Sequence, residues 1–299
     1  MLWLASLLGI AAVGSAIFID FGSDEDELTD DSASSDQEDS TIVPVDTFLA
    51  GGEGEVNSVT GTEELDHLSG GDGADSLSGG EGSDSLHGDD GDDQLDGGAG
   101  DDALFGHFGD DNLNGGSGAD TLHGGTGNDR ADGGEGADSV HGNDGDDTIS
   151  GGAGNDALFG GSGNDVVSGA DDDDTRDYVN GGDGDDTLIA GASDVVTGGD
   201  GSDQILLGDW IAQGTVELVD FDAEEDQLML VYDGSQGEPE IEVEADPDAP
   251  GETVIRLDGE EAMRLTGAES LTAEDILLVP AEDEDIAHSP LPDAHPHAS

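Results

Sequence analysis

Between residues 70 and 168 one apolar residue recurs at every ninth position. The stretch divides without a gap into eleven nonapeptides, and the apolar residue stands at position 8 of each unit, from Leu77 to Val167. Most units end in a polar–apolar–polar triplet, which is typical of a very short β-strand with one side chain pointing inward. The pattern therefore predicts an all-β repeat fold in which every unit contributes one side chain to a shared core.

Glycine dominates the first half of each unit. Positions 1 and 4 are glycine in all eleven units, and position 2 is glycine except at Asp89, His107 and Asn143. Asp, His and Asn are the residues other than glycine that most often adopt a positive φ. We therefore expect a left-handed backbone at position 2, and a tight turn over positions 1 to 4 whose carbonyl groups can point at one spot.

Position 6 is an aspartate in every one of the eleven units. The resulting pattern, G-G-x-G-x-D-x-U-x, resembles the RTX (repeats-in-toxin, hemolysin-type) calcium-binding repeat of Gram-negative bacteria. The resemblance implies a parallel β-roll in which two nonapeptides make one coil, with Ca²⁺ between a turn and the next turn on the same edge. It also implies that backbone carbonyls and position-6 carboxylates are the ligands, here Asp75, Asp84, Asp93, Asp102, Asp111, Asp120, Asp129, Asp138, Asp147, Asp156, Asp165, Asp186 and Asp203.

Irregular units border the eleven. Residues 61–69 lack glycine at positions 2 and 4, residues 169–180 are three residues too long, and residues 190–197 are one residue short. Good copies return at 181–189 and 198–206, which supply the last two of the predicted ligands. The sequence leaves open how many calcium sites form between residues 169 and 197.

Charge supports a cation as the partner. The 299 residues carry a formal net charge of −72, with no lysine, four arginines and no cysteine. Such a composition is typical of disordered chains. The alternative to a folded repeat is therefore a disordered acidic glycine-rich linker, but a linker would not need the strict nine-residue repeat. Nucleic acid is excluded as a partner because like charges repel, and no disulfide framework can form.

Energetics point the same way. Burying one leucine-sized side chain contributes roughly 1.5–3 kcal/mol, whereas ordering nine residues costs roughly 1–2 kcal/mol for each residue. Metal binding must supply the difference, so we expect Ca²⁺ binding and folding to be one event. Calcium suits the role because it accepts six to eight hard oxygen ligands in loose geometry.

The N-terminal flank has two parts. Residues 1–21 begin with an uncharged apolar stretch over 1–19, and residues 22–50 are an acidic linker expected to be disordered. Three interpretations of 1–19 remain open: a membrane anchor, a cleaved signal without the usual basic residues, or a retained segment with neither role.

The C-terminal flank changes character. Beyond the predicted roll at 51–206, residues 207–279 contain alternating apolar segments such as TVELVDF, DQLMLVY, IEVEA and TVIRL. These predict antiparallel strands, which would form a β-rich cap over the end of the solenoid. In the RTX family this region also carries a type I export signal. The proline-rich tail, 280–299, is expected to be disordered.

No catalytic motif is present, since H-E-x-x-H, G-x-S-x-G, P-loop and cysteine nucleophile signatures are all missing. We therefore expect a non-enzymatic protein. The sequence favours an exported calcium-binding β-roll that acts as a structural or interaction module. A membrane-tethered acidic calcium buffer, or an accessory to a secreted enzyme or toxin, is the alternative.

Overall fold

The computed structural model describes residues 40–42, 48–50, 57–170, 175–208, 215–232, 234, 237–268 and 270–280. The chain divides into two units, 1–37 and 38–299, and all of the described residues belong to the second. The apolar segment 1–19, most of the acidic linker and nearly all of the tail lie outside the described residues.

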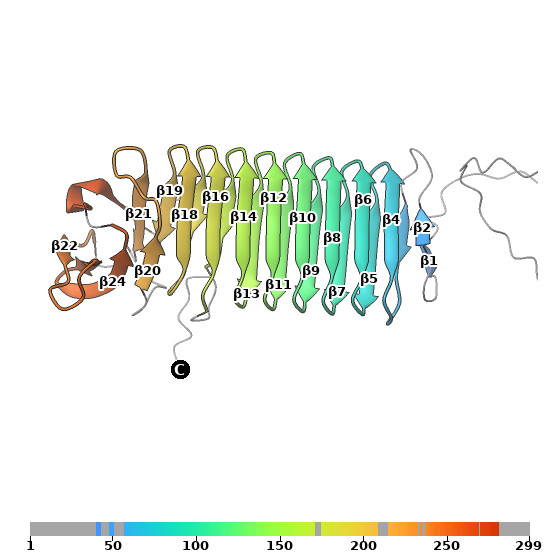
Figure 1. The fold of residues 1–299 in the computed structure, drawn as a ribbon, viewed down its shortest axis with the longest axis horizontal. Coiled ribbons are helices and arrows are strands. Elements are labelled where there is room, and N and C mark those ends of the chain that lie inside the picture. Colours follow the sequence, from blue (N-terminus) through green and yellow to red (C-terminus); the bar gives the residue numbers. More distant parts are fainter. Residues whose placement is uncertain are drawn as a thin grey trace, which may run out of the picture. The chain divides into compact units, whose positions relative to one another are not determined.

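From β1 to β21, successive strands alternate between two sheets, so that each sheet collects every second strand (Figure 1). In spatial order, the described strands of the first sheet are β1 (Ser40–Ile42), β3 (Ser58–Thr60), β5 (Ser76–Glu81), β7 (Gln94–Ala99), β9 (Asn112–Ser117), β11 (Arg130–Glu135), β13 (Thr148–Ala153), β15 (Val166–Ser168), β17 (Thr187–Ile189), β19 (Gln204–Leu207), β21 (Gln227–Tyr232) and β25 (Ile276–Pro280). Those of the second are β2 (Phe48–Ala50), β4 (His67–Asp72), β6 (Ser85–Asp90), β8 (Ala103–Phe108), β10 (Thr121–Thr126), β12 (Ser139–Asp144), β14 (Ala157–Ser162), β16 (Tyr178–Asp183), β18 (Val195–Asp200), β20 (Thr215–Leu218), β24 (Glu260–Thr266), β23 (Glu252–Leu257) and β22 (Ile241–Ala245).

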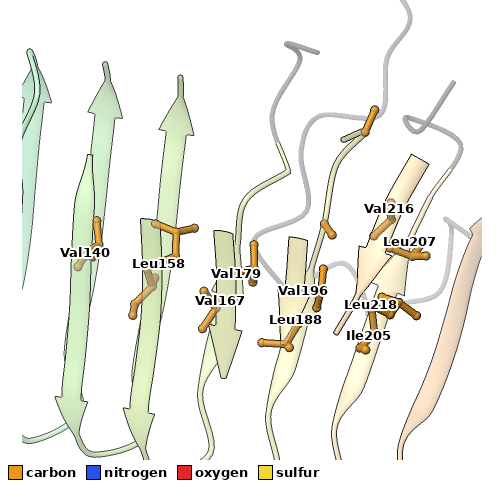
Figure 2. Packing of buried hydrophobic residues seen from close by; sticks show 14 of the residues in the cluster. Val140, Leu158, Val167, Val179, Leu188, Val196, Ile205, Leu207, Val216 and Leu218 are labelled. Carbon is orange, nitrogen blue, oxygen red and sulfur yellow. The ribbon is translucent and has the colours of Figure 1, made fainter. Parts of the chain in front are cut away.

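Each coil contains two nonapeptides, and this confirms the predicted parallel β-roll. Strands β6, β8 and β10 pair in parallel with an 18-residue register that aligns Leu86, Leu104 and Leu122. All three side chains are fully buried, as are most of the other position-8 residues. One continuous apolar core therefore lies between the two sheets, and Figure 2 shows it from Val140 to Leu218.

The strands are longer than the predicted triplets. Most span six residues, positions 7 to 9 of one unit and 1 to 3 of the next, which leaves only positions 4 to 6 for the turn. Positive φ occurs at positions 2 and 4, and it includes Asp89 (77°), His107 (80°) and Asn143 (80°). The expected left-handed backbone at position 2 is thus confirmed, whereas the prediction that positions 1 and 2 belong to the turn was wrong.

The irregular units keep the register of the roll. β14 pairs with β16 across 21 residues, and β16 pairs with β18 across 17, yet position 8 stays aligned from Leu158 through Val179 to Val196. The three-residue insertion and the one-residue deletion both fall between strands, so the ladder of core side chains continues through them.

Beyond residue 206 the prediction of antiparallel strands was half right. β20 and β21 continue the roll in parallel with β18 and β19, because Leu218 and Leu228 still fill the core. Among the described strands, only the pairs β22–β23 and β23–β24 are antiparallel, and they extend the second sheet beyond the parallel pair β20–β24. In the part of the chain that the structure describes, no helix has the length and hydropathy to cross a membrane.

Candidate metal centre

The position-6 aspartates form two columns, one along each edge of the roll, at the turns. Within a column, the backbone N–H of each aspartate donates to Oδ1 of the aspartate one coil later, as from Asp75 to Asp93 (2.7 Å) and from Asp102 to Asp120 (2.7 Å). The first column consists of Asp66, Asp84, Asp102, Asp120, Asp138, Asp156, Asp177 and Asp194. The second consists of Asp75, Asp93, Asp111, Asp129, Asp147, Asp165, Asp186, Asp203 and Asp226.

Most of these carboxylates hold one oxygen that no donor reaches. Their side chains are 1–3% exposed, yet Oδ2 has no hydrogen-bond partner in Asp75, Asp84, Asp93, Asp102, Asp111, Asp120, Asp129, Asp138, Asp147, Asp156, Asp165, Asp186 and Asp203. These are the thirteen residues that the sequence predicts as ligands. Leaving a buried charged oxygen unpaired is costly, so each of these turns requires a positive partner.

A backbone carbonyl of the next coil lies near the same oxygen. A Cβ placed on Gly70 would lie 2.5 Å from Asp75 Oδ2 and 2.7 Å from the carbonyl oxygen of Gly88, one coil later. The equivalent point at Gly97 lies 2.5 Å from Asp102 Oδ2 and 2.6 Å from Gly115 O. Position 1 is therefore glycine because a side chain would fill a space lined by a carboxylate and a carbonyl of the next coil.

Carbonyls at positions 2 and 4 point toward the next turn of the same edge. A Cβ on Gly116 or on Gly118 would overlap with the carbonyl oxygen of Gly98 or of Gly100, respectively. Each turn thus presents carbonyl oxygens to its neighbour on the same edge. Because L-residues rarely adopt the local φ values of 101° and 139°, glycine is favoured at these two positions for a second reason.

The donor set fits calcium. The oxygens near each position-1 glycine are a carboxylate oxygen of its own turn and a carbonyl oxygen of the next coil, and among the described residues no group of three His, Asp or Glu side chains could hold a metal ion. Hard oxygen ligands in a loose arrangement suit Ca²⁺, whereas copper, zinc and iron favour nitrogen or sulfur ligands. The residues present therefore fit the cation that the sequence pattern implies.

Burial makes these carboxylates hard to ionise without a cation. It raises the pKa of Asp111 and Asp165 to about 7, an effect that neighbouring aspartates strengthen and the backbone N–H of the preceding coil opposes. The same balance raises the pKa to about 6 for Asp93, Asp120, Asp129, Asp138, Asp147 and Asp186. A divalent cation would reverse this shift by favouring the charged form.

Four members of the columns, Asp66, Asp177, Asp194 and Asp226, are not among the thirteen predicted ligands. Asp177 and Asp226 each accept the N–H of the preceding aspartate in their column, Asp156 and Asp203. A signal was present, because both aspartates stand two residues before a buried apolar side chain, Val179 and Leu228, as position 6 stands before position 8.

Comparison with protein families gives an independent result. A family model of the RTX calcium-binding nonapeptide repeat, four copies long, matches residues 51–86, 69–104, 78–113, 87–122, 105–140, 114–149, 141–175 and 181–209. RTX nonapeptide repeats bind Ca²⁺. No curated protein matches the sequence. Among solved structures, the extracellular lipase LipA from Serratia marcescens is similar at 16% identity and a TM-score of 0.19, over 81% of this chain and 45% of the lipase chain.

Proposed function

Because the chain belongs to the RTX calcium-binding nonapeptide repeat family, whose model matches just over half of its 299 residues, we propose that its β-roll folds on meeting extracellular Ca²⁺. In this proposal the folded roll acts as a structural or interaction module and not as a catalyst. The carrying observation is the set of thirteen buried Oδ2 atoms that no protein donor reaches.

The proposed ligands are the position-6 carboxylates together with backbone carbonyls of the adjacent coil on the same edge. Bound Ca²⁺ would supply positive charge to oxygen atoms that otherwise face one another. The residues of the chain prepare the site for the cation. Glycine at position 1 leaves the space open, and the N–H of the preceding aspartate fixes the orientation of each carboxylate through Oδ1.

The calcium concentration of each cellular compartment would then control folding. Extracellular calcium-binding modules have dissociation constants of about 10⁻⁴–10⁻³ M. At the far lower calcium level of the cytosol, the roll would lack the cations that its buried carboxylates need. An unfolded chain is suited to type I export, for which the family's C-terminal region carries a signal, and we propose that residues 207–279 combine this role with capping.

The second candidate function is a membrane-tethered calcium buffer. The uncharged apolar stretch over residues 1–19 favours it, since about 20 apolar residues can span a bilayer. The two functions make opposite predictions in fractionation. An exported module is recovered in the medium or at the cell surface, whereas a tethered buffer stays in the membrane pellet and is released by detergent.

A calcium titration of the full chain tests the proposal. We expect a disordered far-UV circular dichroism spectrum in chelator and a β-rich spectrum at millimolar Ca²⁺. Mg²⁺ at equal concentration should have little effect, because it demands tight octahedral geometry and gives up water reluctantly. A compact, β-rich protein in excess chelator, or an equal response to Mg²⁺, would show that calcium does not drive folding.

A further inference from the structure

At three aspartates of the columns the protein itself supplies a donor to the second carboxylate oxygen, in contrast to the thirteen aspartates whose Oδ2 has none. Asp66 Oδ2 accepts both the backbone N–H of Thr62 (2.7 Å) and the Thr62 hydroxyl (3.0 Å). Asp194 Oδ2 accepts the N–H of Gly191 (2.6 Å), and Asp226 Oδ2 accepts the N–H of Asp222 (2.8 Å). All three donors come from the aspartate's own turn.

The position of these turns is systematic. Asp66 begins the first column, Asp194 is its last described member, and Asp226 is the last described member of the second column. Between them stand the thirteen aspartates whose Oδ2 lacks a donor. The self-capped turns therefore stand at three of the four ends of the columns, whereas the second column begins at Asp75, whose Oδ2 has no donor.

Local sequence explains the difference at Asp66. Position 2 of this unit is Thr62 and position 4 is Glu64, where a regular unit has glycine. Neither residue has a positive φ, whereas the corresponding glycines one coil later, Gly80 and Gly82, have φ of 112° and 125°. A β-branched residue strongly disfavours the left-handed region, so this turn takes another course that aims the Thr62 N–H at the carboxylate.

The other two turns reach the same result differently. The turn before Asp194 is one residue short, and Gly191 lies close enough to donate to the carboxylate. The turn before Asp226 is closed by its own backbone, since the N–H groups of Glu225 and Asp226 both donate to the Asp222 carbonyl. Neither contains the G-G-x-G sequence of a calcium turn.

We propose that these three turns are metal-independent stops, at which an N–H group takes the place that Ca²⁺ occupies in the interior turns. The inference rests on the proposed function, because it assumes that the interior turns bind calcium. Two donors on Asp66 Oδ2 use both lone pairs of that oxygen, and a positive N–H dipole would repel a neighbouring cation. Calcium is thereby confined to the turns between Asp66 and Asp194 in the first column and to the turns before Asp226 in the second.

Converting a stop into a regular turn tests the proposal. The double variant Thr62→Gly, Glu64→Gly restores G-G-x-G at residues 61–64 and removes the hydroxyl donor. Equilibrium dialysis of the full chain at saturating Ca²⁺ should then give one more bound ion than the wild type gives. Glu63→Gly is the matched control, because position 3 varies freely among the repeats, and it should bind the wild-type number.

The converse variant tests the same idea without the gain of a site. Gly71→Thr with Gly73→Glu turns the first turn of the second column into a copy of the 61–66 turn, and it should bind one ion fewer. Circular dichroism at saturating calcium verifies that each variant is folded, and if one does not fold, the other decides. Folded variants that bind the wild-type number would overturn the inference while leaving the proposed function intact. A wild-type protein that binds no calcium would instead overturn the proposed function.

Discussion

Each turn aspartate has two oxygens with separate tasks. In the middle of the first column, Asp120 Oδ1 accepts the N–H of Asp102 (2.7 Å), and the Asp120 N–H donates to Asp138 (2.8 Å). Oδ2 remains without a donor. One oxygen thus fixes the register between coils, whereas the other creates the demand for a cation.

Substitutions at Asp120 separate these tasks. Asp120→Ala removes both and leaves the buried Asp102 N–H unpaired, which costs about 1–3 kcal/mol. Asp120→Asn keeps the Oδ1 acceptor but loses the charge. We expect both variants to raise the calcium midpoint in a titration followed by circular dichroism, and alanine to raise it more.

The control is Asp66→Ala, at a self-capped turn, which should shift the midpoint less than either variant of Asp120. An Asp120→Asn protein with the wild-type midpoint would show that this carboxylate's charge is not needed for the calcium response.

At the scale of strands, position 9 of the second sheet forms a ladder of stacked rings. His87, Phe105, His123, His141 and Phe159 lie on β6, β8, β10, β12 and β14, and successive ring centroids are 4.7, 5.3, 4.8 and 4.6 Å apart. Burial lowers the pKa of His123, and burial together with the neighbouring His123 lowers the pKa of His141. The ladder therefore favours neutral imidazoles.

Acid should weaken this ladder. A histidine with a lowered folded-state pKa stabilises the fold above the unfolded value, about 6.5, and that stability is lost as pH falls through it. The variant His123→Phe, His141→Phe keeps the stacked rings and removes the charge. At saturating Ca²⁺, its melting temperature should fall less than that of the wild type between pH 7.5 and 5.5. Equal losses would mean that the two histidines do not contribute to the pH dependence.

At the scale of the whole molecule, the acidic charge is tolerable only when it is neutralised. The formal net charge is −72, and within each column the buried carboxylates of successive coils lie next to one another. Calcium neutralises them in the proposed function. Protons are the other agent that can do so, because the raised pKa values of the buried aspartates mean that the metal-free folded state binds protons more tightly than the unfolded chain.

We therefore expect acid to replace calcium in part. A raised folded-state pKa gives stability that is fully present below the unfolded value, near 3.9, and is lost as pH rises through about 6 to 7. In excess chelator, lowering the pH from 7.5 to about 4 should increase the β-sheet signal in circular dichroism. A spectrum that stays disordered across this range would count against raised pKa values in the turns.

The nine-residue repeat was enough to predict the features that depend on the residues of one unit alone. Positive φ at Asp89, His107 and Asn143 followed from their residue types, and the buried ladder at position 8 followed from its apolar character. Features that depend on a neighbouring coil did not follow. Positions 1 and 2 join the strand because they pair with the next coil, and alternation in β20 and β21 does not distinguish parallel from antiparallel pairing.

The hydrogen bonds of the two columns all point the same way, from each aspartate N–H to the carboxylate one coil later. Cut between any two coils, the stack would expose anionic acceptors on one broken face and amide hydrogens on the other. Two such faces from different molecules are complementary, and a head-to-tail contact of this kind does not close on itself but propagates. Deleting residues 1–57 together with 215–299 exposes one face of each kind and should therefore give calcium-dependent filaments in electron micrographs, whereas the intact protein, whose sheets end at β25 and β22, should remain dispersed.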